Sequence, residues 1–195
     1  MRALLLVFVG IFVAIVALGV SGVMYLRANG ASARGDAGTI ERTVARAARR
    51  FAIRTTSGPR RNPVPASAEN VAAGLEHFAD HCASCHANDG SGETEVGRGL
   101  YPKAPDMRLD ATQQLADGEL FEIIDKGVRF TGMPAWGTGT PASDDSTWKL
   151  VLFIRHLPQL TPAELEQMKA LNPRSPEDVR AEIEEERFLN EGVTP

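Results

Sequence analysis

The chain contains only two cysteines in 195 residues, Cys82 and Cys85. A framework of several disulfides is therefore excluded. A structural zinc site is disfavoured because it needs four ligands, and no second cysteine pair exists. A thioredoxin-like redox pair is typical of a βαβ setting, whereas the sequence around these cysteines has a helical pattern with many glycines and prolines.

Two other signatures are also missing. The sequence has no glycine-rich loop of the kind that cradles phosphate groups. The many arginines between residues 27 and 61 are not interleaved with aromatic residues, apart from Phe51. Single-stranded nucleic acids are bound by basic grooves that also carry aromatic side chains. We therefore expect neither a hydrolase that acts on nucleotides nor a nucleic-acid partner.

The most informative stretch that is present is residues 82–86, Cys-Ala-Ser-Cys-His. This spacing puts two thiols one turn apart, where they can add to the two vinyl groups of a haem, while the imidazole of His86 reaches the iron. A plain disulfide would explain neither the tight spacing nor the histidine. We predict one haem c, covalently bound through Cys82 and Cys85, with His86 as an iron ligand.

Charge is segregated along the chain, although the formal net charge is only −4. Nine basic and two acidic residues lie in residues 27–61, whereas residues 62–158 have seven basic and fourteen acidic residues. The last 37 residues have four basic and nine acidic ones. This pattern predicts four parts: a transmembrane anchor (1–26), a basic neck (27–66), a haem domain (67–158) and an acidic helical tail (159–195).

Residues 3–26 carry no charge and are dominated by Leu, Val, Ile, Phe and Ala. As a helix they would be about 36 Å long, enough to cross a hydrocarbon core of about 30 Å. We expect residues 3–26 to be the part of the chain that contacts the membrane. A cleaved signal peptide is the alternative, because Arg2 gives a basic start and residues 31–33 resemble a cleavage site. The apolar stretch is, however, longer than the typical h-region of about 7–15 residues.

The neck and the tail each contain a helical pattern. Ile40, Val44, Ala48 and Phe51 recur at helical spacing among arginines, which predicts a short basic amphipathic helix that ends at residues 57–59. This helix is expected to lie on anionic lipid, to dock on the acidic tail or to be a solvated spacer. In the tail, residues 161–164 predict a capping box, and a second helix opens at residues 175–178. A charged solvated helix is the favoured interpretation there, with a partner-docking arm as the alternative.

Gly74 and Phe78, followed by the Cys-x-x-Cys-His run, resemble class I cytochrome c, in particular the small cytochromes related to the third subunit of some haem-copper oxidases. The resemblance covers about residues 67–158. It implies an all-α fold around one haem, in which the helix beginning after Ser67 crosses the last helix of the domain. It also implies that Trp148 packs near Gly74 and Phe78, and that the carbonyl of Pro105 accepts a hydrogen bond from the N–H of the proximal histidine.

Two further helices are expected in this domain. The first has Asp117 as its N-cap and ends at Gly127. The last domain helix starts near Ser143 or Asp144 and stops at Leu157 and Pro158.

Met133 is the predicted sixth iron ligand. It lies in a Gly-Met-Pro turn, 47 residues after His86, and this turn resembles the axial methionine loop of the family. A methionine thioether favours the reduced iron and raises the potential. Of the other methionines, Met107 has the place of an apolar residue that lines the haem pocket. His77 and His81 are too close to the motif to reach the distal face, and His156 is expected to cap carbonyls or to face solvent.

Iron with histidine and methionine ligands has no free position for a substrate, so we predict an electron carrier rather than an enzyme. The expected partners are redox proteins of a respiratory chain, without a small-molecule substrate. One alternative is a fixed subunit through which electrons enter an oxidase or dehydrogenase. The others are a haem sensor or enzyme with a labile sixth ligand, and a membrane-interaction module whose haem is only structural.

The location of the domain follows from two conflicting signals. Arg27, Arg34 and the arginines beyond them would draw the C-terminal side into the cytoplasm under the positive-inside rule. The family resemblance implies the opposite, because such cytochromes carry their haem outside the cytoplasmic membrane. We give the haem more weight and expect a single-pass protein of the bacterial inner membrane with a periplasmic haem domain.

Overall fold

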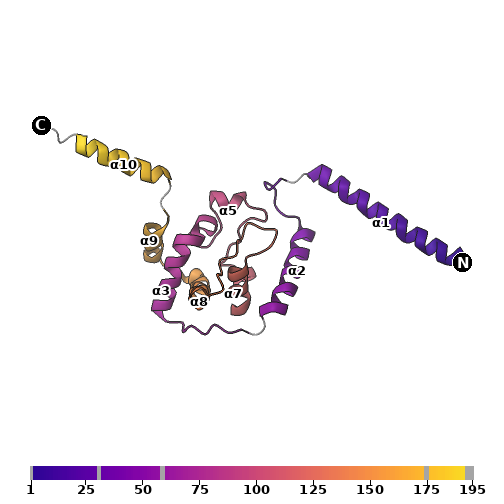
Figure 1. Cartoon of the computed structure of the whole chain (residues 1–195), viewed down its shortest axis with the longest axis horizontal. Helices are drawn as coiled ribbons and strands as arrows, with labels where there is room; N and C mark the ends of the chain where they lie inside the picture. The colour runs from indigo at the N-terminus through magenta and orange to yellow at the C-terminus, as the bar shows by residue number, and fades with distance from the viewer. Residues whose placement is uncertain (1, 30–31, 58–59, 174–175, 192–195) are drawn as a thin grey trace. The chain divides into compact units, whose positions relative to one another are not determined.

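The computed structural model describes residues 2–29, 32–57, 60–173 and 176–191. Within these ranges every regular element is helical, which confirms the all-α fold class (Figure 1). The chain forms two units, Met1–Gly35 and Asp36–Pro195. The helices are α1 (Arg2–Asn29), α2 (Thr39–Ser57), α3 (Ala68–His77), η1 (Phe78–Cys82), α4 (Ala83–His86), α5 (Glu95–Gly99), α6 (Asp110–Gln113), α7 (Asp117–Lys126), α8 (Pro141–His156), η2 (Leu157–Gln159), α9 (Pro162–Leu171) and α10 (Pro176–Glu191).

α1 is the apolar helix that the sequence predicts. It is 28 residues long and has the length and composition to cross a membrane. Its large apolar side chains are exposed, so they are available to lipid. A helix of this kind close to the N-terminus fits both the anchor and the signal-peptide interpretation, and residue 31 of the proposed cleavage site lies outside the described residues.

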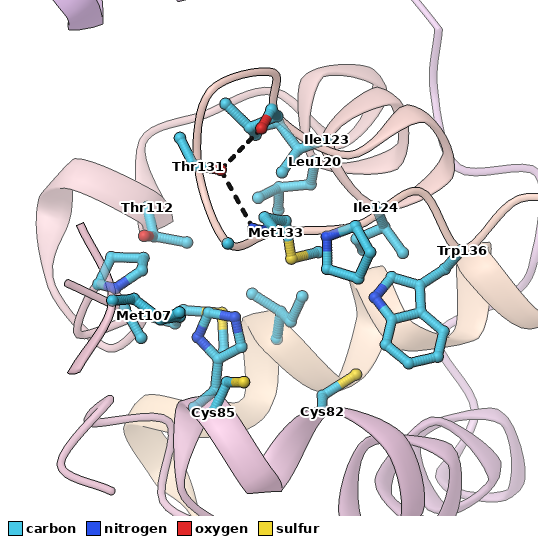
Figure 2. A pocket seen from close by; sticks show the side chains of 18 of the residues that line it. Cys82, Cys85, Met107, Thr112, Leu120, Ile123, Ile124, Thr131, Met133 and Trp136 are labelled. Carbon is cyan, nitrogen blue, oxygen red and sulfur yellow. Dashed lines mark hydrogen bonds between the residues drawn. The ribbon is translucent and has the colours of Figure 1, made fainter. Parts of the chain in front are cut away.

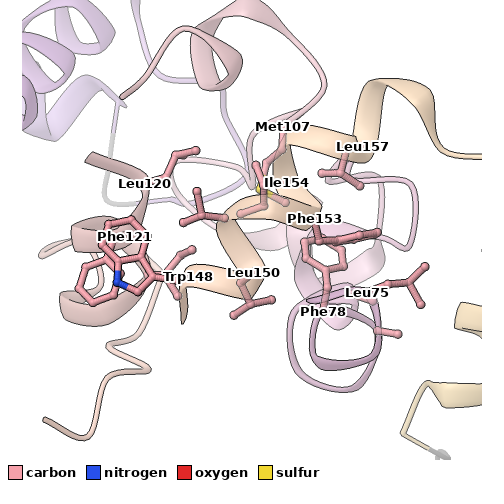
Figure 3. Close-up of a cluster of buried hydrophobic side chains, with 14 of the residues drawn as sticks. Leu75, Phe78, Met107, Leu120, Phe121, Trp148, Leu150, Phe153, Ile154 and Leu157 are labelled. Atoms are coloured by element: carbon pink, nitrogen blue, oxygen red, sulfur yellow. The ribbon is translucent and has the colours of Figure 1, made fainter. Parts of the chain in front are cut away.

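The core of the second unit is the crossing of α3 and α8, and Gly74 sets its spacing. A Cβ atom at Gly74 would overlap the backbone carbonyl of Lys149 and would lie 2.9 Å from the Cβ of Phe153. Next to this contact, the rings of Phe78 and Phe153 pack with their centroids 5.1 Å apart (Figure 3). The predicted crossing of the first and last domain helices is therefore present, and Ser67 is the N-cap of α3 as expected.

The aromatic partner at this crossing differs from the expectation. Trp148 stacks on Phe121 of α7, with centroids 4.3 Å apart and an interplanar angle of 29° (Figure 3). Phe153, five residues later, takes the place next to Phe78 that we expected for Trp148. Because each residue turns a helix by about 100°, residues five apart point in clearly different directions. Trp148 therefore joins α8 to α7, and Phe153 joins α8 to η1.

Two helix starts also differ slightly from the prediction. The N-cap of α7 is Ala116, whose N–H donates to the carboxylate of Glu119 at 2.8 Å, so Asp117 is the first helical residue. α8 begins at Pro141, because the Thr140 hydroxyl accepts the N–H of Ser143 at 3.3 Å and caps the helix earlier than expected. α7 does end at Gly127, where φ is 64°.

Arg155 connects α8 to the segment that precedes α7 through hydrogen bonds. Its guanidinium donates to Asp117 Oδ1 at 3.1 and 2.8 Å and to the carbonyl of Gln113 at 2.6 Å. A further donor of the same group contacts the carbonyl of Leu115. The planar fork of arginine can satisfy several acceptors at once, so this one side chain holds α6 and the start of α7 against α8.

The amphipathic helix of the neck is confirmed as α2, and it contacts the haem domain. α2 packs on α7, the hydroxyl of Tyr101 donates to Glu41 at 2.6 Å, and Lys103 pairs with Asp36 at 2.8 Å. Beyond α2, Asn62 donates to the carbonyl of Trp148 at 2.9 Å. These contacts are with the domain, not with the tail. Residues 58–59, where we predicted the helix break, lie outside the described residues.

α9 is part of the domain, so the solvated-helix interpretation is wrong for this helix. Met168 is completely buried in the hydrophobic core cluster. The predicted capping box is present, since Thr161 N–H donates to Glu164 at 2.8 Å and the Thr161 hydroxyl accepts the N–H of Glu164. His156 contacts Glu164 at 2.8 Å, so it joins α8 to α9 and does not cap carbonyls. The start predicted for the next helix, at residue 175, lies outside the described residues.

Candidate haem-binding site

The Cys-x-x-Cys-His run lies on two consecutive helical turns. The π-helical turn η1 ends at Cys82, and α4 ends at His86. Such wide turns are rare and are frequently found at functional sites. The hydroxyl of Thr94, at the start of α5, donates to the carbonyl of Cys85 at 3.1 Å. Gly97 lies so close to the same carbonyl that a Cβ there would overlap it. α5 therefore braces the backbone of the motif.

The environment of the two thiols argues against the alternatives to haem. Burial, with a smaller contribution from Cys85, raises the pKa of Cys82 to about 12. A redox-active cysteine pair works through a thiolate and needs a lowered pKa. Among the described residues, no group of three or more His, Cys, Asp or Glu side chains is arranged to hold a metal ion. The thioredoxin-like and zinc interpretations are both disfavoured.

His86 has the state that an iron ligand needs. Burial lowers the pKa of its imidazole, while the backbone of Pro105 acts in the opposite direction and raises the pKa. The ring is therefore neutral at pH 7 and has a lone pair to donate to a metal. Its Nδ1 atom is buried and has no hydrogen-bond partner within bonding geometry. The backbone of Pro105, which raises the pKa of this ring, is the acceptor that the family resemblance implies for this atom.

Met133 is held by a short loop between α7 and α8. The N–H of Val128 donates to the carbonyl of Met133 at 3.0 Å, and the N–H of Met133 donates to the hydroxyl of Thr131 at 3.1 Å. A Cβ at Gly127 would lie 2.5 Å from the backbone of Pro134, and the positive φ of Gly127 also favours glycine. The loop is thus fixed at both ends, which sets the direction of the methionine side chain.

One cavity of about 320 Å³ is lined by both cysteines of the motif, by His86 and by Met133. Figure 2 shows Cys82 and Cys85 on one side and the sulfur of Met133 on the other, pointing toward the space between them. This volume is typical of small-molecule and cofactor sites. The remaining walls are mostly apolar and come from several elements, including Phe78, Leu120, Ile124, Trp136, Leu150 and Ile154. Paired thiols, an imidazole, a thioether and apolar walls fit an iron macrocycle such as haem.

Two residues that we had not assigned to the site also line the cavity. His81 faces it, and its ring meets Trp136 edge-on with centroids 5.5 Å apart. Arg49 of α2 is the second, and no sequence signal distinguished it from the other arginines of the neck. His77 contacts His81 at 4.8 Å between centroids and, like His156, does not line the cavity.

Comparison with known proteins agrees with this site. The family model described as "Cytochrome C oxidase, cbb3-type, subunit III" matches residues 69–154. A curated relative, "Cbb3-type cytochrome c oxidase subunit FixP" of Rhizobium meliloti (strain 1021), is 34% identical over 94 residues. The aligned part is 48% of this chain and 29% of the relative, so the chain spans less than a third of that protein. The matched region contains the Cys-x-x-Cys-His motif, the methionine loop and most of the two crossing helices. Residues 69–154 are therefore similar to the c-type cytochromes of the third subunit of cbb3-type haem-copper oxidases.

Proposed function

We propose that the domain binds one haem c and that the chain passes single electrons between respiratory redox partners. The observation that supports this most strongly is that Cys82, Cys85, His86 and Met133 line the same apolar cavity. Met133 comes from a loop 47 residues beyond His86, so chain folding, and not sequence proximity, brings the thioether to the motif.

The protein residues have separate roles in this proposal. Cys82 and Cys85 would hold the haem covalently, and His86 and Met133 would be the side chains that bind its iron. A bound haem supplies a reversible one-electron couple. If His86 and Met133 both bound the iron, no position would be left there for a substrate, and the domain would carry electrons without catalysing a reaction. The carbonyl of Pro105 would accept the N–H of His86, which would orient the ring and strengthen it as a ligand.

Membrane attachment through α1 places the domain next to membrane-bound partners, on the periplasmic side of the inner membrane. The relative from Rhizobium meliloti is named as an oxidase subunit, which favours a fixed subunit of a respiratory oxidase as the second candidate. A subunit stays with its complex during purification in mild detergent, whereas a free carrier is recovered alone. Excess acidic charge in residues 62–158 steers basic partners toward the domain and makes their association slower at high salt.

The test is the visible spectrum of the full chain, compared with Met133→Ala and with Met107→Leu as the matched control. Both methionines line the cavity, and Met107 is buried. Leucine conserves the volume of a methionine but cannot bind iron. The oxidised wild type and the control should show the weak band near the red edge that accompanies a sulfur–iron bond. Met133→Ala should lose this band, and only this variant should bind carbon monoxide when reduced.

Two outcomes would contradict the proposal. If Met107→Leu loses the band and Met133→Ala keeps it, the ligand assignment is wrong. If the wild type lacks the band and binds carbon monoxide itself, the sixth position is open, and a sensor or an enzyme becomes the better interpretation.

A further inference from the structure

α2 forms part of the wall of the haem cavity, although it lies outside the matched cytochrome region, which begins at residue 69. α2 packs on α7, which also lines the cavity through Leu120 and Ile124. The ion pair between Asp36 and Lys103 and the hydrogen bond from Tyr101 to Glu41 fix this segment at the loop that follows α5. Arg49, one of the arginines on α2, lines the cavity itself.

The guanidinium of Arg49 is partly desolvated. Its Nε atom is buried and has no hydrogen-bond partner. Burial lowers the pKa of Arg49, the adjacent charges of Arg46 and Arg50 lower it further, and the carboxylate of Glu119 opposes them. Desolvating a charge is costly unless an anion and further hydrogen bonds compensate it. An additional acceptor at Nε would complete the environment of this side chain.

The cofactor of the proposed function carries such acceptors, because haem has two propionate carboxylates. Among the described residues, two basic side chains that are always charged at neutral pH line the cavity, Arg49 and Lys103. Lys103 is already paired with Asp36 at 2.8 Å. We propose that Arg49 binds a haem propionate, so that α2 completes the haem site from outside the cytochrome region. This inference rests on the proposed binding of haem c.

The consequence is electrostatic. A guanidinium next to a propionate keeps that carboxylate ionised and offsets its negative charge. Without the guanidinium, the carboxylate would favour the oxidised iron and would take up a proton at a higher pH. Removing Arg49 should therefore lower the midpoint potential, and the loss should grow as the pH rises and the unpaired propionate ionises.

The experiment is a spectroelectrochemical titration of the haem-loaded full chain over a range of pH, with Arg49→Gln and Arg46→Gln. Arg46 is exposed and lies one turn away on α2, so both variants lose one charge from the same helix. Arg50 and Glu119 also act on the charge of Arg49, and Lys103 and His81 line the same cavity. All four are the same in both variants. Arg49→Gln should have a lower midpoint potential than the wild type, and the difference should grow as the pH rises. Arg46→Gln should have the same midpoint potential as the wild type at each pH.

Equal pH profiles for the two variants would overturn the assignment of Arg49 while leaving the proposed function intact. A wild type without covalent haem would instead overturn the proposed function. If Arg49→Gln does not retain haem, Arg49→Lys serves as the test. This variant keeps the charge but loses the planar fork. We therefore expect its midpoint potential to fall with pH more than that of the wild type and less than that expected for Arg49→Gln. A profile identical to that of the wild type would contradict the proposal.

Discussion

Glu164 links α9 to the haem domain through its charge. Burial raises the pKa of this carboxyl, but hydrogen bonds from Thr161 and His156 outweigh burial, and the pKa lies below the ordinary value of 4.5. A carboxyl with a lowered folded-state pKa stabilises the fold above its unfolded-state pKa, and this contribution disappears as the pH falls through the folded-state pKa. We therefore predict that Glu164→Gln lowers the free energy of unfolding by about 1 kcal/mol at neutral pH, and by less in acid.

Denaturant unfolding of the full chain at pH 7 and near pH 4 would measure this effect. Glu166→Gln is the control, because Glu166 lies on the same helix, is exposed and forms an ion pair with the exposed Lys169. The control should behave like the wild type at both pH values. An equal loss of stability for Glu164→Gln at both values would show that its charge is not what matters.

The residues of the site differ in how readily the sequence alone identifies them. Cys82, Cys85 and His86 form a contiguous motif whose chemistry is local, and Met133 lies in a recognisable turn, so all four could be proposed before the structure was known. Arg49 could not, because its role depends on which face of α2 meets α7, and the arginines around it are chemically identical. His156 was misread for a similar reason, since its partner Glu164 lies on a helix whose docking had not been expected.

At the level of helices, the packing of α3 on α8 depends on the absence of a side chain at residue 74. Alanine is favoured over glycine in a helix interior by about 1 kcal/mol, but a Cβ at this position would overlap the Lys149 carbonyl. Backbone atoms cannot move away as a flexible side chain can. We predict that Gly74→Ala lowers the free energy of unfolding by about 1–3 kcal/mol, measured by denaturant unfolding of the haem-loaded protein.

Gly99→Ala is a matched control, because a Cβ at Gly99 meets no atom within 4 Å. This variant should leave stability nearly unchanged. If Gly74→Ala is as stable as the control, the two helices can separate without cost, and close contact at Gly74 does not set their spacing.

Most of the helices could be predicted from the sequence, whereas the elements against which each helix packs could not. Apolar periodicity and capping residues such as Ser67 and Thr161 are local signals, and the predicted helices are present. Packing partners depend on the rotation of each helix about its axis, so Trp148 was assigned the contact that Phe153 makes. The charge of α9 suggested a solvated helix, but the side chain of Met168 is completely buried in the core of the domain.

On the scale of the whole molecule, the chain divides at residues 35 and 36, between the unit of α1 and the unit that contains the cavity. All residues that line the cavity belong to the second unit. Membrane attachment and haem binding should therefore be separable. A chain that begins at Asp36 should remain in the supernatant after ultracentrifugation and should have the spectrum and midpoint potential of the full chain.

The full chain should sediment with membranes and be released by detergent but not by high salt, because α1 attaches through apolar contacts that salt does not weaken. The mass of the purified protein distinguishes a retained anchor from a cleaved signal peptide. A chain that begins at Ser67 and so lacks α2 is the complementary variant, and it should have a lower potential because it lacks Arg49. If the chain from Asp36 still sediments with membranes, the second unit binds lipid by itself, and the basic helix α2 becomes the first surface to test.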